Sequence, residues 1–257
     1  MSNNLPNLKI VSLNSLVLHE DVDPLRVKRL MAKIKQDRIF TNPPLVAPIG
    51  KSNKFVVLDG ANRTTVFKSL GYKDILVQVV NYSQPGLELK TWNHLVVGLP
   101  VKSFFAKISK ALLKSARANF KLQGNKIICL PIKTKNFFEQ VQSLNKIAAI
   151  YKNKYKFYRF DNENNLSVVS RNKTLIIFPK FKPKDIILVA QKNLKIPSGI
   201  TRHVISGRAL RIDIPLEILK NKKSLGQKNL ELKKLIAKRF EENKIRHYQE
   251  PIFIFND

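Results

Sequence analysis

The chain has 257 residues, 44% of them hydrophobic, which is enough for one large domain or two smaller ones around a sizeable core. Its apolar runs fall short of the roughly 20 residues of a transmembrane helix. Its first residues lack the basic flank and apolar core of a signal peptide, so we expect a cytoplasmic protein without membrane association. The single cysteine, Cys129, excludes an intrachain disulfide and a cysteine-rich metal site. A formal net charge of +29 predicts nonspecific attraction to nucleic acid, although the lysines are spread along the chain.

The first helix that the sequence predicts follows an N-terminal strand and begins at Pro24. Asp23 is a favourable N-cap, and proline suits the first helical position. Apolar residues recur there with helical spacing, namely Val27, Leu30, Met31 and Ile34. The pair His19-Glu20 precedes this helix. From the residues alone, Glu20 is either a catalytic base or an acid that favours the helix dipole, and Asp21 and Asp23 would serve the second role equally well.

Residues 55–71 predict a strand that runs through a glycine turn into a helix. The apolar run Phe55–Leu58 reads as a buried strand, Asp59-Gly60 breaks it, and Thr64–Leu70 reads as a short helix ended by Gly71. Such a junction leaves backbone N–H groups pointing outward, with the positive end of the helix dipole behind them. That arrangement binds phosphate.

Several residues of this junction are candidates for contact with a phosphate ligand. Arg63 carries a fork of donors that fits phosphate oxygens, and Asp59 can hold a metal ion or orient a hydroxyl group. The residues expected to form the phosphate cradle are Gly60, Ala61, Asn62, Arg63 and Thr64. The competing interpretation is an ordinary strand–turn–helix with a solvated Asn-Arg pair, in which Asp59 serves only the turn.

The rest of the pattern divides the chain into three parts. Residues 1–82 form an α/β unit that closes with a strand over Ile75–Val80, and residues 83–125 read as a partly helical connecting segment. Residues 126–257 read as a second α+β lobe. Helices are expected in it over Phe137–Tyr151, 183–191 and Gln227–Lys244, the last with Leu232, Leu235, Ile236 and Phe240 facing inward. Strands are expected over 127–132, 155–160, 166–169, 174–178 and 251–255, with a turn at 124–125.

The order of these motifs resembles the ParB/sulfiredoxin superfamily, whose nucleotide-binding domain carries a DG-x-x-R or G-x-x-R loop at a helix N-terminus. Within that superfamily the chain most resembles the free serine kinases, over nearly its whole length. Four motifs carry the resemblance. They are the His19-Glu20 pair before a proline-led helix, the DG-x-x-R loop, the T-W-x-H of residues 91–94, and the block from Pro197 to Leu210 followed by Ile214-Pro215-Leu216.

The resemblance implies a role for each matching residue. Glu20 is expected to be the catalytic base, and Asp59 is expected to be a second catalytic residue. The DG-x-x-R loop is expected to bind the nucleotide. The residues expected to bind the substrate are Trp92, Thr201, Arg202, His203 and Arg208. The loop departs from many relatives, because Ala61 and Asn62 stand where at least one histidine is common. Nucleotide binding is expected to survive this change, whereas any role of an imidazole there is in doubt.

The resemblance also implies the activity and the fold class. We expect an α/β (α+β) protein with a ParB/sulfiredoxin-like N-terminal domain, a second α+β lobe and an active site in the cleft between them. The expected reaction is transfer of a phosphoryl group from ATP or ADP to free L-serine, giving O-phospho-L-serine, with Mg²⁺ as cofactor and metal ligands unassigned.

Two other classes of protein share the superfamily. A ParB-like DNA-binding regulator is supported by the charge, but no convincing helix-turn-helix follows residue 82, and such a protein has no need of Trp92 and the Thr-Arg-His block. A sulfiredoxin-like reductase needs a nucleophilic cysteine in the phosphate loop, and Cys129 lies far from that loop in the sequence.

Overall fold

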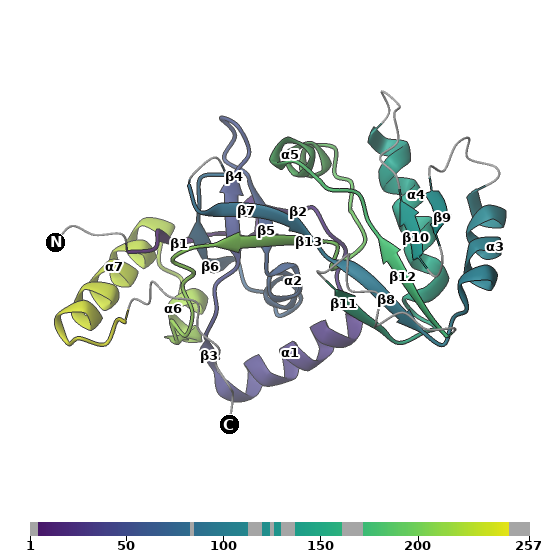
Figure 1. The fold of residues 1–257 in the computed structure, drawn as a ribbon. Coiled ribbons are helices and arrows are strands. Elements are labelled where there is room, and N and C mark those ends of the chain that lie inside the picture. The colour runs from purple at the N-terminus through teal and green to yellow at the C-terminus, as the bar shows by residue number, and fades with distance from the viewer. Residues whose placement is uncertain are drawn as a thin grey trace. The chain divides into compact units, whose positions relative to one another are not determined.

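The computed structural model describes residues 5–82, 85–112, 120–123, 126–129, 137–160 and 172–246. The chain divides into two compact units, which are taken separately below (Figure 1). The first unit is drawn from Met1–Leu18, Val22–Glu88 and Val204–Asp257, and the second from His19–Asp21 and Leu89–His203.

This division differs from the three parts predicted above, of residues 1–82, 83–125 and 126–257. The chain from residue 204 returns to the first unit, because its apolar residues complete that unit's core. Ile214, Leu216, Leu219 and Leu232 are all buried in one cluster with strand residues of the N-terminal sheet. Residues 89–112 are likewise no connector, since they supply an interior strand and a helix of the second unit.

The first unit is built on a five-stranded sheet with the order β1-β6-β4-β5-β2. Its strands are β1 (Leu8–Ser12), β2 (Leu16–Leu18), β4 (Leu45–Pro48), β5 (Phe55–Asp59) and β6 (Asp74–Val79). The short strands β3 (Ile39–Phe40) and β14 (Ile214–Pro215) pair beside it, and a 3₁₀ turn, η1, spans Leu13–Ser15. The predicted N-terminal strand is present as β1, and the predicted strands at Phe55–Leu58 and Ile75–Val80 are present as β5 and β6, two interior strands buried on two faces.

Four helices cover this sheet, and local sequence explains where three of them start. They are α1 (Pro24–Asp37), α2 (Ala61–Ser69), α6 (Leu216–Lys220) and α7 (Leu225–Glu241). The Asp23 carboxylate caps α1 as predicted, and Ser224 forms a capping box with Gln227 at the start of α7. Helix α2 begins three residues earlier than predicted, since Gly60 itself is the N-cap.

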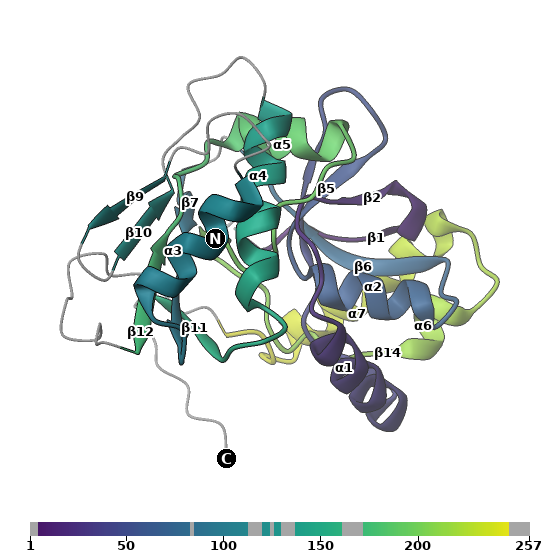
Figure 2. The ribbon, with the colours of Figure 1, turned by 90° about the vertical axis from the view of Figure 1, so that its right-hand side faces the viewer.

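Helix α7 lies against β1, and α6 lies near β6 (Figure 2). Leu232 is buried there, and Leu235 and Ile236 are partly buried against the same core, as predicted. The predicted inward position of Phe240 is wrong, because its side chain is 54% exposed near the end of the helix.

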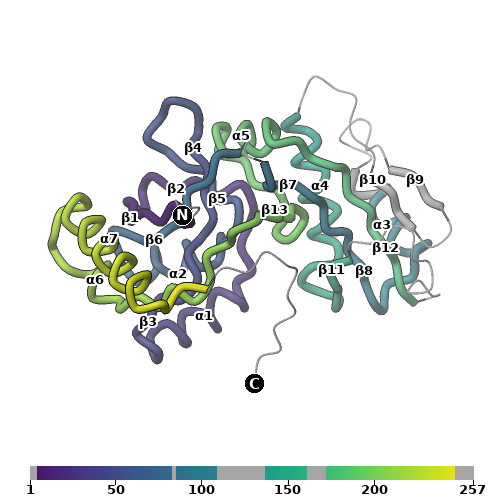
Figure 3. Tube along the Cα trace, turned by 60° about the vertical axis from the view of Figure 1, so that its left-hand side comes forward, coloured from purple at the N-terminus to yellow at the C-terminus, as the bar shows by residue number. Residues whose placement is uncertain are grey.

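In the part of the chain that the structure describes, the second unit contains a sheet with the order β11-β8-β12-β10-β9 and the helices α3, α4 and α5 (Figure 3). Its strands are β8 (Asn93–Val97), β9 (Phe120–Gln123), β10 (Lys126–Cys129), β11 (Phe157–Phe160) and β12 (Lys173–Ile177). Its helices are α3 (Val101–Leu112), α4 (Phe137–Tyr151) and α5 (Pro183–Gln191). The bounds of α4 and α5 are those predicted. The predicted turn at 124–125 and the predicted strands at 166–169 and 251–255 lie outside the described residues.

Two strands carry the chain from one unit to the other. These are β7 (Leu87–Thr91) and β13 (Thr201–Ile205), which form a two-stranded sheet of their own. Trp92 lies directly after β7, and Thr201, Arg202 and His203 lie on β13. Of the helices that the structure describes, none is both long and apolar enough to cross a bilayer.

Candidate active site

The phosphate loop of the first unit has the geometry that its sequence predicts. Gly60 joins β5 to α2 with φ of 98°, in the left-handed region that favours glycine. A Cβ atom at this position would lie 3.0 Å from the Cα atom of Pro44, so no larger residue fits without displacing the neighbouring turn. Gly60 offers no side-chain cap, so the first-turn N–H groups of α2 are directed to a ligand or to water. This end of α2 is therefore suited to an anion.

The side chains of two predicted loop residues face the protein. Thr64 is buried and its hydroxyl group donates to the Gly60 carbonyl over 3.1 Å. The Asn62 Oδ1 atom accepts a 2.9 Å hydrogen bond from the backbone N–H of Asp23, which ties the start of α2 to the cap of α1. Both side chains thus hold the loop in place, and the predicted cradle rests on backbone groups.

Asp59 is held by two guanidinium groups at the mouth of this loop. Its Oδ2 atom lies 2.8 Å from Nη2 of Arg63 and 2.9 Å from Nη2 of Arg208. Partial burial would raise the pKa of Asp59, but the charges of Arg63 and Arg208 outweigh that effect and hold it below its ordinary value. The Asp59 side chain is still 52% exposed, so the carboxylate and both arginines border solvent.

Arg208 is fixed in this position by contacts that the sequence did not predict. Its Nη2 atom also donates to the Pro43 carbonyl over 2.8 Å, and its Nη1 atom donates to Gln78 Oε1 over 3.1 Å. The buried Gln78 amide also donates to the Gly207 carbonyl and accepts from the Ala209 N–H, so it spans the turn that carries Arg208. Sequence reasoning missed Gln78, whose one signal is a lone amide within the apolar run 75–80.

Glu20, in the second unit, is the centre of a separate polar cluster. Its Oε2 atom accepts a 2.9 Å hydrogen bond from the Gly199 N–H. Its Oε1 atom accepts from the Thr201 N–H over 2.7 Å and from the Thr201 hydroxyl over 2.5 Å. An isolated β-bridge between Glu20 and Ile196 joins the same two segments through their backbones. The His19-Glu20 motif and the distant block that starts at Pro197 are therefore one structural feature.

The buried His19 ring extends this cluster. Its Nε2 atom lies 2.8 Å from the Thr201 hydroxyl oxygen, and because that hydroxyl donates its proton to Glu20, we assign His19 Nε2 as the donor. The His203 ring meets His19 edge-on, with 5.6 Å between ring centroids. A carboxylate, a hydroxyl and two imidazoles thus lie together.

Trp92 and Arg202 form a polar–aromatic pair in the second unit. The Arg202 guanidinium carbon lies 4.2 Å from the centroid of the Trp92 ring, within the range of a cation–π contact. The backbone N–H of Trp92 donates to the backbone carbonyl of Ile200, the residue before Thr201, over 2.7 Å. Four of the five residues predicted to bind the substrate therefore belong to one unit, whereas Arg208 belongs to the first unit with Asp59.

The 198–201 loop is contacted by Lys152 and Arg159, which the sequence did not single out, and by His94 of the T-W-x-H motif. Lys152 Nζ donates to the carbonyl and the hydroxyl of Ser198 over 2.6 Å and 2.9 Å. A Cβ atom at Gly199, where φ is 75°, would lie 2.6 Å from Nη2 of Arg159. His94, the last residue of T-W-x-H, donates from Nε2 to the Gly199 carbonyl over 2.9 Å and lies 2.5 Å from the Tyr151 hydroxyl through Nδ1.

His94 is expected to make stability dependent on pH. Burial lowers its pKa to about 3, with the charges of Lys152 and Arg159 acting in the same direction. The unfolded chain, with a histidine pKa of about 6.5, binds more protons below that pH, so this contribution is complete above pH 6.5 and is lost as the pH falls toward 3. Urea unfolding should show a loss of roughly 1–3 kcal/mol from pH 6.5 to 4.5 that His94→Gln reduces. Parallel pH curves for the two proteins would contradict this assignment.

The same residues bear on whether the site can hold a metal ion. In the described part of the chain, no three His, Cys, Asp or Glu side chains gather as a metal cage. Mg²⁺ needs only one or two carboxylates when nucleotide phosphates supply further oxygens. Asp59, an exposed carboxylate beside the anion-binding loop, fits that requirement.

The comparisons with known proteins extend over most of the chain. No family model matches it. The ATP-dependent L-serine kinase SbnI of Staphylococcus aureus is 25% identical over 255 residues, which cover 96% of both chains. An ATP-dependent L-serine kinase of Staphylothermus marinus is 34% identical over 89 residues, 35% of each chain.

Solved structures agree with this result. C-terminally truncated SbnI from Staphylococcus aureus has a TM-score of 0.73 at 24% identity and covers 91% of this chain and 97% of its own. A free serine kinase mutant in complex with AMP has a TM-score of 0.66 at 16% identity, and the match covers 85% of this chain and 98% of that kinase chain. Together these matches confirm the α+β fold and the resemblance to the serine kinases that the motifs indicated.

Proposed function

We propose that this chain, a relative of the ATP-dependent L-serine kinases, is itself an ATP-dependent kinase that converts free L-serine to O-phospho-L-serine. The observation that carries the proposal is the carboxylate of Glu20, which receives three hydrogen bonds from Gly199 and Thr201. Two of the motifs shared with the serine kinases thus form one polar cluster, in a chain whose similarity to such a kinase covers 96% of its length.

In the proposed reaction the serine hydroxyl oxygen attacks the terminal phosphorus of ATP. A new P–O bond forms, the bond to the leaving phosphate oxygen breaks, and Glu20 takes the hydroxyl proton. The first-turn N–H groups of α2 and the guanidinium groups of Arg63 and Arg208 would stabilise negative charge on the phosphates. Mg²⁺, held by the phosphates and Asp59, would supply further neutralisation of that charge.

The amino acid would be recognised by the residues of the second unit. A guanidinium group suits a carboxylate, and the Arg202 guanidinium is positioned by its contact with the Trp92 ring. His203 and Thr201 would contribute hydrogen bonds that distinguish a hydroxy amino acid. The cleft expected between the lobes and the cytoplasmic location stay predictions.

The activity test is direct. Purified protein is incubated with Mg²⁺, L-serine and either ATP or ADP, and O-phosphoserine is measured by mass spectrometry. We expect product with ATP, and little with D-serine or L-threonine in place of L-serine. Absence of phosphoserine with both nucleotides would overturn the proposed function.

Substitutions in the two units should separate the two substrates. Arg63→Ala removes a charge-assisted phosphate contact worth roughly 1.5–3 kcal/mol and should raise the KM for nucleotide about tenfold or more. His203→Asn should raise the KM for serine much more than that for nucleotide. Since Arg208 shares Asp59 with Arg63, Arg208→Gln should follow Arg63→Ala. Steady-state kinetics with each substrate varied will check this, with melting curves as the control for folding. Equal effects on both substrates would contradict two distinct half-sites.

Binding to nucleic acid, if present, should be nonspecific. The comparisons do not favour a DNA-binding regulator, but a net charge of +29 attracts phosphate backbones through counterion release. Affinity for short duplexes should therefore be the same for unrelated sequences and should fall steeply between 50 and 200 mM salt, on the order of 10³-fold or more if several phosphates are neutralised. Fluorescence anisotropy will measure this. A preferred sequence that survives physiological salt would instead favour the regulator.

A further inference from the structure

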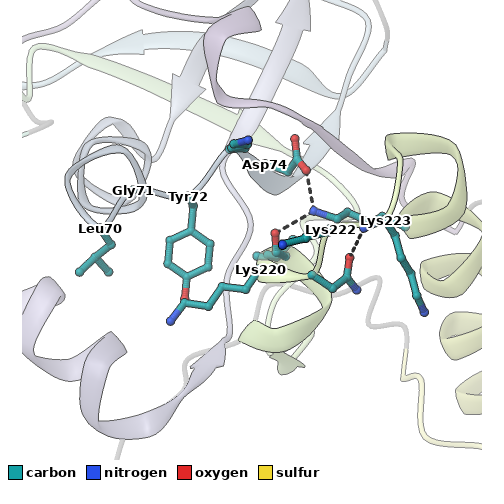
Figure 4. Close-up of a pocket in the computed structure, with 11 residues that line it drawn as sticks. Leu70, Gly71, Tyr72, Asp74, Lys220, Lys222 and Lys223 are labelled. Carbon is teal, nitrogen blue, oxygen red and sulfur yellow. Dashed lines mark hydrogen bonds and ion pairs between the residues drawn. The ribbon is translucent and has the colours of Figure 1, made fainter.

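A second concave site lies in the first unit, apart from the phosphate loop. It is a pocket of about 510 Å³ between the start of β6 and the turn that joins α6 to α7 (Figure 4). Its polar lining consists of Tyr72, Lys73, Asp74, Lys220, Asn221, Lys222, Lys223 and Lys228. We call it the lysine pocket. It shares no residue with the loop at 59–64.

The charge of this pocket is strongly unbalanced. Its single carboxylate, Asp74, is already bound by the buried Lys228, whose Nζ atom donates to Asp74 Oδ2 over 2.7 Å and to the Leu219 carbonyl over 2.9 Å. Lys223 pairs with Glu231, outside the pocket. Within the described part of the chain, Lys73, Lys220 and Lys222 form no ion pair.

Lys73, Lys220 and Lys222 are exposed, and one of them has a buried aromatic neighbour. Lys220 ends α6 and lies with its ammonium group 5.5 Å from the centroid of the buried Tyr72 ring. The Lys228–Asp74 ion pair joins α7 to the start of β6, so both walls of the pocket are tied together. Like charges around one cavity repel each other, and an anion with several charges would relieve that repulsion.

We propose that the lysine pocket binds a small multivalent phosphate anion, of the class of pyrophosphate and longer polyphosphates. A concave site of this volume suits a small molecule, whereas duplex DNA requires a broad basic surface. An adjoining pocket of about 430 Å³ shares Leu70, Tyr72 and Lys220, and its lining adds two cations, Lys35 and Arg38, and one carboxylate, Glu217. The basic surface therefore continues from the lysine pocket, which favours a chain of phosphates over a single one.

The proposal is tested by calorimetry on the full chain at constant ionic strength. Inorganic tripolyphosphate and pyrophosphate are each titrated into the protein, and orthophosphate is titrated in the same way for comparison. The double variant Lys220→Gln/Lys222→Gln should lower tripolyphosphate affinity about tenfold or more, since it removes charge-assisted contacts. The matched variant Lys233→Gln/Lys234→Gln, with the same charge change on exposed α7 residues outside the lysine pocket, should stay within about twofold.

Two further measurements distinguish the lysine pocket from the proposed nucleotide site. Arg63→Ala should leave tripolyphosphate binding at the lysine pocket intact, and Lys220→Gln/Lys222→Gln should leave the KM for ATP unchanged, so the proposal stands or falls independently of the kinase activity. Equal losses in the two lysine double variants would overturn it, because the binding would then follow net charge alone. Duplex DNA that displaces tripolyphosphate, with the same dependence on Lys220 and Lys222, would assign the surface to nucleic acid instead.

Discussion

Replacing Glu20 by glutamine is expected to lower turnover roughly a hundredfold or more, the scale of a lost general base. The amide keeps nearly the same shape but cannot accept the hydroxyl proton of serine. Nucleotide affinity should stay unchanged, because the phosphate-binding groups belong to the first unit. Single-turnover phosphoserine formation and nucleotide titration will measure the two quantities separately.

Glu20 also has a structural task, so this experiment needs controls. The glutamine amide nitrogen would face an N–H donor at Gly199 or Thr201, which can shift the loop. Lys152→Met removes the Lys152 hydrogen bonds to Ser198 and leaves the Glu20 carboxylate in place, so it tests how far a disturbed loop alone lowers turnover. Asp21→Asn makes the same chemical change at an exposed neighbouring acid and should have little effect. Near-normal turnover of Glu20→Gln would remove this residue from the mechanism.

The second large effect is expected on stability, at the buried ion pair of the first unit. Lys228→Met should lower the free energy of unfolding by about 3–5 kcal/mol, because Asp74 is left as a buried charge without its partner. The exposures of the two side chains are only 3% and 13%, so water can replace little of the lost interaction. Urea unfolding at neutral pH will measure the change.

Two further variants distinguish the effect of losing the ion pair from the effect of losing a lysine side chain. Lys234→Met, on an exposed position of the same helix, should change stability by no more than about 0.5 kcal/mol. The double variant Lys228→Met/Asp74→Leu removes both charges and should recover much of the loss, as apolar replacements of buried pairs do. A loss in Lys228→Met no larger than in Lys234→Met would show that Asp74 is solvated after all.

Local sequence was enough to predict many elements of this protein. The cap at Asp23 with Pro24, the strand over Phe55–Leu58 and the helices Phe137–Tyr151 and Pro183–Gln191 depend on residues within a few positions of each other. The left-handed glycine between β5 and α2 is equally local. For this reason the phosphate loop and the Glu20 motif were both recognisable in the sequence.

Only the tertiary structure shows which distant residues contact these motifs. Arg208 reaches Asp59 across 149 positions of sequence, and Thr201 reaches Glu20 across 181. No periodicity or cap links such distant residues. The apolar residues of α6 and α7 can be buried on any exposed sheet face, and their packing on β1 and β6 brings residues from 204 onward back to the first unit. Arg208 therefore lies beside Asp59, because long-range burial of apolar surface, which local pattern does not encode, sets the path of the chain.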